Sequence, residues 1–339
     1  MKRLSRTVVI VALATALMFS LAACGGQPSQ PGTAQKPPEQ PKVVKLGIIQ
    51  IVEHPSLDQA RKGFLDLLAE KGYKDGEKLA VDYQNAQGDM STADTIAKKF
   101  VADKKDLVLA IATPTAQAMA NATKDIPILI TAVTDPVAAG LVESLEKPNT
   151  NVTGTTDMNP VKEQLALFRE LAPAAKKIGI IYNSSEVNSR VQVDLAKKAA
   201  PDLGYTIEEA VATNSAEVLQ AARTLAGKVQ GIYVPTDNTV VSALESVIKV
   251  AEEKKIPLVV GEGDSVKRGG LATVGIDYYK LGRQTGEMAL RILEQGAKPQ
   301  EMPVEAQKEY EIVLNKKAAA NMGVTLPESL LAKAAKVYE

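Results

Sequence analysis

Short apolar runs alternate with amphipathic segments from Val43 to the end of the chain. The apolar runs are rich in β-branched residues, as in Val43–Ile51, and have the length of buried strands. The segments between them carry apolar residues at helical spacing, as in Leu57–Lys71, where Gly72 is a natural stop. Alternating strands and helices with short connections predict an α/β fold, with parallel sheets that have helices on both faces.

The same pattern predicts the individual elements. Ser91 is the expected cap of the second helix, and Asn151–Met158 is expected to cross between two lobes. The expected strands span residues 43–51, 79–84, 107–112, 126–132, 177–182, 206–211, 231–234, 257–261, 270–274 and 308–314. The expected helices span residues 57–71, 90–103, 160–171, 188–202, 215–225, 238–254, 281–295 and 327–335, with one more directly after 113–117.

An internal repeat organises these elements. Lys45–Ile49 (KLGII) returns 132 residues later as Lys177–Ile181 (KIGII), and Gly72-Tyr73 returns at the same offset. Further matches join residues 124–130 to 254–260 and residues 140–141 to 270–271. Two α/β segments can share such runs by chance, but here the order and spacing hold over four matches. We therefore expect a duplicated fold.

The repeat divides the chain into two similar Rossmann-like lobes joined by about three hinge crossovers. A chain of 339 residues suits two domains of ordinary size. The elements after Asp277 fall outside the repeat, so we expect them to return to the lobes. The predicted N-terminal lobe is residues 44–156 plus 278–304, and the C-terminal lobe is residues 157–277 plus 305–339.

The N-terminal segment has the layout of a bacterial lipoprotein leader. A positive start is followed by the apolar run Val8–Ala23, which is short for a membrane span. The only cysteine, Cys24, follows directly in a sequence that resembles a lipobox, in which this residue is lipidated. Residues 1–23 are thus a predicted signal peptide, and residues 24–43 a disordered tether rich in Pro, Gln and Gly. The predicted location is outside the cell membrane, anchored through Cys24.

Composition excludes several classes of protein. Lys+Arg and Asp+Glu both number 40 and aromatic residues make up 4%, so no basic or base-stacking surface for nucleic acid is expected. One cysteine and one histidine leave no ligand set for a metal and no disulfide within the chain. Phosphate-loop, dinucleotide and nucleophile-elbow motifs are missing from the sequence. We expect no cofactor, no metal and no enzyme activity.

Ligands of parallel sheets bind beyond the carboxyl ends of the strands, so the loops there carry the candidate site. Thr113 and Thr115 stand at one helix start and residues 183–185 at another, where hydroxyls and backbone N–H groups favour a carboxylate. Asp135 and Asp237 occupy comparable rims and could pair with an ammonium group, which together predicts an α-amino acid ligand. Helix capping is the open alternative for each of these residues. The candidate ligand-binding residues are Gln50, Glu53, His54, Thr113, Thr115, Thr134, Asp135, Tyr182, Asn183, Ser184, Ser185, Asn188, Ser189, Thr236, Asp237, Glu262 and Asp277.

Five segments resemble the family of ABC-importer substrate-binding lipoproteins that includes the tryptophan/tyrosine-binding TrpX proteins. They are Ile51–Asp58, Thr113–Gln117, Thr131–Val137, Asn183–Ser189 and Pro235–Asn238. The resemblance implies the type I periplasmic binding protein fold, a monomer, ABC permease partners and an aromatic amino acid ligand. Among the few aromatic residues, Tyr182 and Tyr233 would be the stacking partners.

Other functions remain open from the sequence. A LacI-like repressor shares this fold, but a signal segment stands where its DNA-binding headpiece would be. A two-lobe hydrolase or transferase would need a nucleophile or metal set that the sequence does not offer. A ligand-sensing lipoprotein, or an importer component for a metabolite that is not an amino acid, fits the sequence equally.

Overall fold

The computed structural model describes residues 43–339, which belong to one compact unit, Pro41–Glu339. The predicted signal peptide, the predicted lipidation site Cys24 and almost all of the predicted tether lie outside the described residues. No helix among residues 43–339 is long and apolar enough to cross a membrane.

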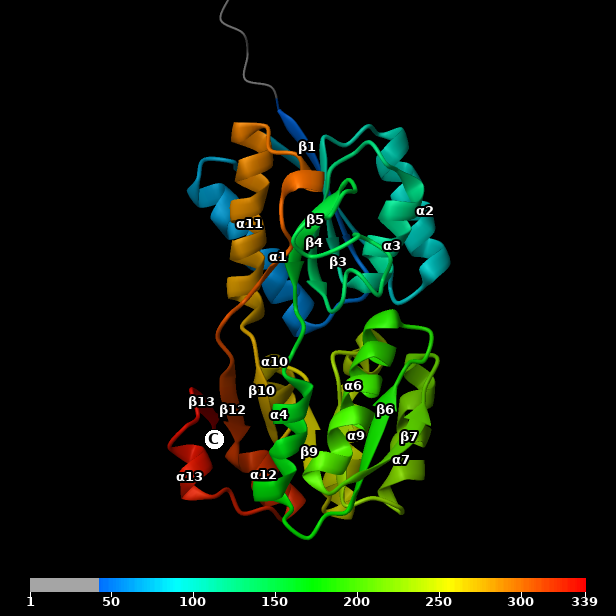
Figure 1. Ribbon diagram of the computed structural model, residues 1–339, viewed down its shortest axis with the longest axis vertical. Helices are drawn as coiled ribbons and strands as arrows, with labels where there is room; N and C mark the ends of the chain where they lie inside the picture. The colour runs from blue at the N-terminus through cyan, green and yellow to red at the C-terminus, as the bar shows by residue number, and fades with distance from the viewer. Residues whose placement is uncertain (1–42) are drawn as a thin grey trace, which may run out of the picture. The chain divides into compact units, whose positions relative to one another are not determined.

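A six-stranded sheet forms the first lobe, in the order β11-β5-β4-β3-β1-β2 (Figure 1). All neighbouring strands in it are parallel. The strands are β1 (Val44–Gln50), β2 (Leu79–Asn85), β3 (Leu107–Ile111), β4 (Ile128–Val133), β5 (Val152–Thr156) and β11 (Glu305–Ala306). The helices of this lobe are α1 (Pro55–Glu70), α2 (Met90–Ala102), α3 (Thr113–Ala122) and α11 (Tyr278–Gln295), with a 3-10 turn at Pro299–Glu301.

A seven-stranded sheet forms the second lobe, in the order β13-β12-β10-β9-β8-β6-β7. Only β12 runs antiparallel to its neighbour β10. The strands are β6 (Lys177–Tyr182), β7 (Thr206–Val211), β8 (Gly231–Val234), β9 (Leu258–Val260), β10 (Ala272–Gly275), β12 (Glu311–Asn315) and β13 (Lys336–Tyr338). The helices are α4 (Val161–Ala166), α5 (Phe168–Leu171), α6 (Val187–Leu203), α7 (Val218–Ala226), α8 (Asn238–Ser242), α9 (Leu244–Lys254), α10 (Gly263–Arg268), α12 (Lys316–Met322) and α13 (Glu328–Leu331), with a 3-10 turn at Ser215–Glu217.

The structure confirms the duplicated α/β fold. Strands β4-β3-β1-β2 of the first sheet match β9-β8-β6-β7 of the second, in the same order. The glycines of the repeated strand motif have equivalent roles. A Cβ atom on Gly47 would lie 2.7 Å from the Phe100 ring of α2, and one on Gly179 would lie 2.9 Å from Leu225 of α7. Both positions favour glycine, because a side chain of the helix packs directly on the strand there.

Three connections join the lobes, between β5 and α4, between β10 and α11, and between β11 and β12. Each lobe has its own hydrophobic core, and the core of the first lobe includes α11 residues such as Leu281 and Met288. The elements after Asp277 therefore return to both lobes, as expected. Strand β11 places Glu305 and Ala306 in the first sheet. The predicted lobe boundaries at 156/157, 277/278 and 304/305 stay a prediction.

Helices α1 and α11 lie side by side and pack backbone to backbone (Figure 1). A Cβ atom on Gly63 of α1 would lie 2.1 Å from the Tyr279 carbonyl oxygen. One on Gly282 of α11 would lie 1.9 Å from the Ala60 carbonyl oxygen. Such distances are too short for any side chain, so these glycines set the spacing of the two helices. The packing holds the segment after the second crossover against the start of the first lobe.

Several local expectations were wrong. Asp89, not Ser91, caps α2 by accepting a hydrogen bond from the Thr92 N–H at 2.6 Å. The long helix expected from residue 238 is interrupted at Ala243, and α10 was not expected at all. The expected helix over residues 327–335 shortens to α13, and residues 336–338 beyond it pair with β12.

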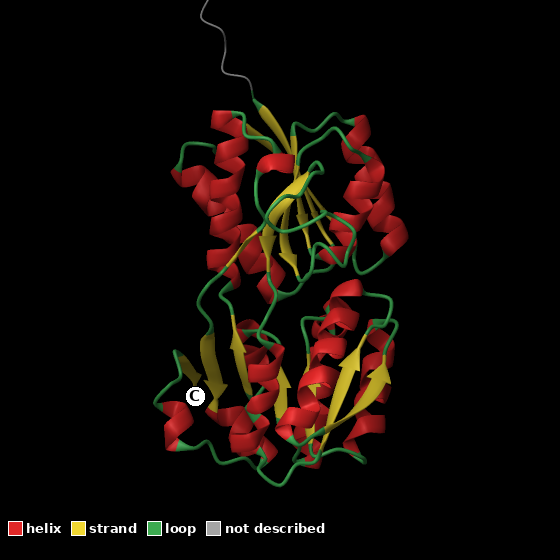
Figure 2. Cartoon of the chain, viewed as in Figure 1, coloured by secondary structure: helices red, strands yellow, loops and turns green. Residues whose placement is uncertain are grey.

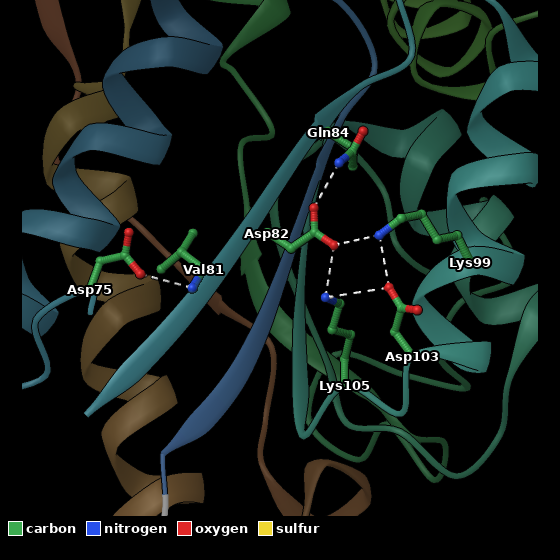
Figure 3. A network of polar contacts seen from close by, with 7 residues as sticks. All are labelled: Asp75, Val81, Asp82, Gln84, Lys99, Asp103 and Lys105. Atoms are coloured by element: carbon green, nitrogen blue, oxygen red, sulfur yellow. Dashed lines mark hydrogen bonds and ion pairs between the residues drawn. The ribbon is translucent and has the colours of Figure 1, made fainter. Parts of the chain in front are cut away.

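Charged side chains cover β2, an edge strand of the first sheet. Figure 3 shows Asp82 accepting from Gln84 and pairing with Lys99 at 2.6 Å and Lys105 at 2.8 Å, while Lys99 also pairs with Asp103. These lysines and Gln84 hold the pKa of Asp82 well below its usual range, although burial opposes them. The network ties the strand to α2 and the loop after it. It also places charge on an edge that could otherwise pair with another chain.

Candidate functional site

The strands of the first sheet, and those of the second sheet other than β12 and β13, end facing the region between the lobes (Figure 2). The loops that follow them enclose a small cavity of about 20 Å³, which we call the head-group cavity. That volume holds about one water-sized group. Its lining comes from both lobes and from two of the connections between them: His54, Leu57, Ala132, Thr134, Asp157, Asn188, Thr236, Asp237, Asn238, Val241, Glu262 and Tyr278.

Four lining residues carry buried polar atoms that have no hydrogen-bond partner among residues 43–339. They are His54 Nδ1, Asp157 Oδ1, Asn188 Oδ1 and Thr236 Oγ1. Leaving a buried polar group unpaired typically costs about 1–3 kcal/mol. Such a concentration of unpaired atoms around one cavity is typical of a binding site whose ligand supplies the missing partners.

Three of the lining residues are acids, and none of the lysines and arginines within residues 43–339 lines the cavity. Asp157, Asp237 and Glu262 are all nearly inaccessible to solvent, at 3%, 1% and 2% exposure. Burial raises the pKa of each carboxyl group, in the case of Asp237 to about 7. Buried carboxyl groups without a cation favour a ligand that brings positive charge.

Asp237 is held by the second lobe itself. Its Oδ2 accepts from the Asn183 N–H and the Ser189 hydroxyl, each at 2.6 Å, and its Oδ1 accepts from the Val240 N–H at 2.7 Å. The neighbouring Glu186 adds to burial in raising the pKa of Asp237. Asp237 therefore caps α8 and fixes the loop after β6 while it also lines the cavity. The capping alternative and the site prediction are compatible at this residue.

Glu186 organises the same corner and was not predicted. It is buried, and its carboxylate accepts hydrogen bonds from the side chains of Asn188, Asn238 and Thr239 and from two backbone N–H groups. Glu186 lies between the Asn183–Ser185 loop and α6. A glutamate at the start of a helix is common, so the sequence gave no reason to select it as a site residue.

His54 stands at the N-terminal end of α1 and lines the cavity from the first lobe. Burial, and then the charge of Arg268, lower the pKa of His54 to about 3. The imidazole is therefore neutral at physiological pH, and it offers one donor and one acceptor nitrogen rather than a charge.

A second cavity of about 460 Å³ lies between the lobes, and we call it the side-chain cavity. Asn238 lines both cavities. The apolar part of the lining of the side-chain cavity comes from Ile51, Val52, Met90 and Pro114 of the first lobe. The rest of its lining is mainly polar: Gln87, Gly88, Asp89, Gln117, Asn183, Ser185, Glu186, Thr213, Asn214, Ser215, Asn238, Thr239 and Ser242.

The start of α3 has the features of an anion-binding helix end. Ala112, just before it, has a positive φ of 80°, which costs energy for a residue other than glycine. Thr113 is buried, and its hydroxyl has no partner among the described residues. Thr115 instead donates to the Ile111 carbonyl at 2.7 Å, so its hydroxyl serves the turn. Pro114 of this helix lines the side-chain cavity.

The structure brings part of the predicted residue set together. The head-group cavity takes His54, Thr134, Asn188, Thr236, Asp237 and Glu262, and the side-chain cavity takes Asn183 and Ser185. The Ser189 hydroxyl donates a hydrogen bond to Asp237. The remaining candidates, which line neither cavity, are Gln50, Glu53, Thr113, Thr115, Asp135, Tyr182, Ser184 and Asp277.

Most of these remaining candidates have other partners. Gln50 bonds Asp58 and Arg61, and Asp135 caps the turn that follows it. Asp277 caps α11 through the Lys280 N–H at 3.0 Å. Glu53 is exposed. Ligand contact by these residues stays a prediction.

Aromatic residues are arranged differently from the expectation. Tyr233 is completely buried, and its hydroxyl donates to Gln164 within the core of the second lobe. Tyr182 donates to Glu209 at 2.8 Å. The aromatic side chain that lines the head-group cavity is Tyr278, which follows β10 directly. The sequence did not single out Asp157 either. This residue follows β5, and the segment that forms β5 was expected to be a crossover between the lobes, not a strand.

Residues 43–339 contain no cluster of three or more His, Cys, Asp or Glu side chains that could hold a metal ion.

A two-lobe α/β fold with a polar, ligand-sized space between its lobes defines a solute-binding protein. The chain belongs to the ABC transporter substrate-binding protein family, whose model matches residues 45–338. Substrate-binding proteins of ABC importers work outside the cytoplasm, and the fold is that of the type I periplasmic binding proteins.

Three relatives describe the family more closely. The chain is 52% identical to the tyrosine-binding protein of Clostridioides difficile, over 85% of this chain and 83% of the relative. The ABC domain from Streptococcus pneumonia, solved in complex with L-Trp, is 42% identical, with a TM-score of 0.84 over 87% of this chain and 100% of that one. A ligand-free, open substrate-binding protein from Clostridium difficile is 50% identical, with a TM-score of 0.66 over 87% of this chain and 99% of that one.

Proposed function

We propose that this protein binds an aromatic α-amino acid, tyrosine or tryptophan, between its lobes and presents it to the permease of an ABC importer. The ammonium group of the ligand occupies the head-group cavity, its carboxylate lies toward the start of α3, and the aromatic ring extends into the side-chain cavity. The protein acts as a monomer without catalytic activity and is held at the outer face of the cell membrane by lipidated Cys24.

The observation that carries this proposal is the head-group cavity itself. No lysine or arginine of residues 43–339 lines the cavity beside its three acids, and the lining residues His54, Asn188 and Thr236 carry buried polar atoms without a hydrogen-bond partner in that range. An ammonium group supplies both the positive charge and the hydrogen-bond donors that such a lining requires. The Thr113 hydroxyl at the start of α3 has no hydrogen-bond partner among residues 43–339, and it suits the carboxylate of the same ligand because a helix N-terminus favours an anion.

The ring of the ligand needs more room than the head-group cavity has. The side-chain cavity provides it, with apolar contacts from Ile51, Val52, Met90 and Pro114. Polar residues such as Gln117 and Asn183 line the same space and suit a phenol hydroxyl or an indole N–H. The relatives from Clostridioides difficile and Streptococcus pneumonia, whose names give tyrosine and L-Trp as ligands, support this ligand class.

Binding proceeds by closure of the lobes. The backbone is more similar to the L-Trp complex than to the open, ligand-free relative, although the open relative is the more similar in sequence. This difference supports a hinged clamp, in which the structure described here has its lobes drawn together. A ligand that contacts both lobes shifts the population toward that closed form, which is the form a permease recognises.

The ligand proposal is tested with protein that lacks residues 1–24, using thermal shifts over the twenty amino acids and common metabolites. Affinities follow by calorimetry. The chain contains no tryptophan, so selectively excited indole fluorescence comes from L-tryptophan alone, and its change during a titration reports on binding. We expect stabilisation by L-tyrosine or L-tryptophan. Stabilisation by sugars or nucleosides only would reject the proposal.

The anchor is tested separately in cells. We expect the full-length protein in the membrane fraction and Cys24→Ala either released or retained as an uncleaved precursor. An unchanged, processed membrane-bound product in the variant would reject lipidation at Cys24. Uptake of labelled ligand by cells with and without the protein distinguishes transport from ligand sensing.

A further inference from the structure

We propose that Asp157, in the connection between β5 and α4, is the residue that receives the ammonium group of the ligand, and that Tyr278 holds it in position. The assignment rests on the proposed amino-acid ligand and places the charge recognition of the site on the hinge rather than on either lobe. Neither residue stands out in the sequence as a binding residue.

Asp157 is the acid of the head-group cavity that retains an unused oxygen. Its Oδ2 accepts a hydrogen bond from the Tyr278 hydroxyl at 2.5 Å, while its Oδ1 has no hydrogen-bond partner among the described residues. By contrast, Asp237 accepts three hydrogen bonds. Glu262 uses both oxygens to cap Ser265. The unpaired oxygen of Asp157 is therefore the acceptor still available to a donor in the cavity.

The surroundings of Asp157 favour a cationic partner over a neutral one. Its side chain is 3% exposed, and burial raises the pKa of its carboxyl group, against the opposing influence of the Tyr278 and Thr134 hydroxyls. The other titratable groups that line the cavity are Asp237, Glu262 and His54, and His54 is neutral. An ammonium group beside Asp157 would stabilise its ionised form and supply donors to the neighbouring unpaired atoms.

Size supports the same assignment. The head-group cavity has a volume of about 20 Å³, close to that of one water molecule. An ammonium group is of similar size, whereas a carboxylate or a ring is larger. The acids also disfavour a carboxylate there by repulsion. The cavity thus fits the positive end of a zwitterion.

The bond between Asp157 and Tyr278 joins two of the three connections between the lobes. Asp157 follows β5 of the first sheet, and Tyr278 begins α11 directly after β10 of the second. A ligand charge on Asp157 therefore acts where the chain changes lobe. Binding of an ammonium group at Asp157 would therefore affect how these two connections lie relative to each other.

The test compares pairs of ligands that differ only in the ammonium group: L-tyrosine with 3-(4-hydroxyphenyl)propionate, and L-tryptophan with indole-3-propionate. Calorimetry on wild-type protein and Asp157→Asn gives the ratio of affinities within each pair. We expect Asp157→Asn to weaken amino-acid binding by about 30-fold or more, since that is the usual scale for one member of a buried charge pair. Binding of the deaminated analogues should change by less than about 3-fold.

Two further variants make the result specific. Tyr278→Phe keeps the acid but removes its fixed orientation, and it should reduce the same selectivity ratio by a smaller factor. Asp202→Asn removes an exposed carboxylate that pairs only with Lys162 at the surface of the second lobe, and should leave both affinities unchanged. Thermal unfolding of each variant checks that the protein is folded before affinities are compared.

The outcomes separate the two proposals. If wild-type protein binds L-tyrosine or L-tryptophan and Asp157→Asn keeps the wild-type selectivity for the amine, the assignment of Asp157 is overturned and the proposed function stands. Equal loss of the amine and its deaminated analogue also overturns it, since that result indicates a merely structural role. If wild-type protein binds neither amino acid, the proposed function fails and the assignment fails with it.

Discussion

The Ser56 hydroxyl lies 3.3 Å from Asp264 Oδ2 and joins the start of α1 in the first lobe to α10 in the second. Ser56 is almost completely buried at this contact. The bond joins the two lobes, so under the proposed hinged closure it would be made only in the closed form. It lies beside the head-group cavity but is made by residues that do not line it.

Removing this bond should weaken ligand binding without removing a ligand contact. A hydrogen bond typically contributes about 0.5–1.5 kcal/mol, so Ser56→Ala should raise the dissociation constant for L-tyrosine by about 2- to 10-fold. Calorimetry measures the effect. Thr224→Ala removes a hydroxyl that bonds only the preceding turn of its own helix and serves as the control. Equal affinities in wild type and Ser56→Ala would show that the contact does not contribute to closure.

The pH dependence of stability should reveal Asp237. Its pKa rises from 3.8 to about 7 on folding, because of burial and then of Glu186. Between these values the folded protein binds more protons at this residue than the unfolded chain does. Raising the pH from about 4 to about 7 therefore lowers this residue's contribution to the free energy of unfolding. Urea unfolding of ligand-free wild type and Asp237→Asn over this range measures the difference, and we expect the decline to disappear in the variant.

His54 should act in the opposite direction. Its pKa falls from 6.5 to about 3 on folding, because of burial and then of Arg268. The unfolded chain therefore binds the extra proton, and stability from this residue is lost as the pH falls below about 6.5. Compared with wild type, His54→Asn should lose less stability between pH 6.5 and 4. A variant curve parallel to that of wild type would show that the imidazole is already accessible to protons in the folded state.

The close packing of α1 on α11 gives a prediction about stability alone. Gly282→Ala places a methyl group where the Ala60 carbonyl oxygen stands, so the helices must move apart. We expect a loss of about 1–3 kcal/mol in the free energy of unfolding, the usual scale for overpacking. Thermal and urea unfolding measure this loss. Gly227→Ala is the matched control, because a Cβ atom there has no neighbour within 4 Å and its φ of −86° suits any residue. Equal stability of the two variants would contradict the packing argument.

The sequence predicted the fold because the information for it is local and repeated. The apolar runs became β1 and β6, and the echoed Gly47 and Gly179 proved to be the places where α2 and α7 press on those strands. The C-terminal end of the chain was harder to predict. Residues 336–338 join the second sheet as a strand beside β12, and neither their length nor their pattern predicts that pairing.

The candidate site was predictable as a set of loops but not as a set of contacts. His54, Asn188 and Asp237 follow strands or begin helices, and the rule for parallel sheets places such residues at the rim. Whether an acid at the rim only caps a turn, as Asp135 does, or also lines a cavity, as Asp237 does, depends on what packs above it. The sequence does not show which groups from distant parts of the chain pack there.

By itself, then, the sequence determined the strand and helix order, the duplication, the lack of a motif for catalysis and the loops that carry polar groups, because each follows from neighbours along the chain. The tertiary structure alone decided that Asp157 and Tyr278, 121 residues apart, share a hydrogen bond beneath the cavity. It also decided that Tyr233 faces the core. The physical reason is that burial and the pairing of polar atoms are properties of three-dimensional neighbours, which only the closed arrangement of two sheets and three connections brings together.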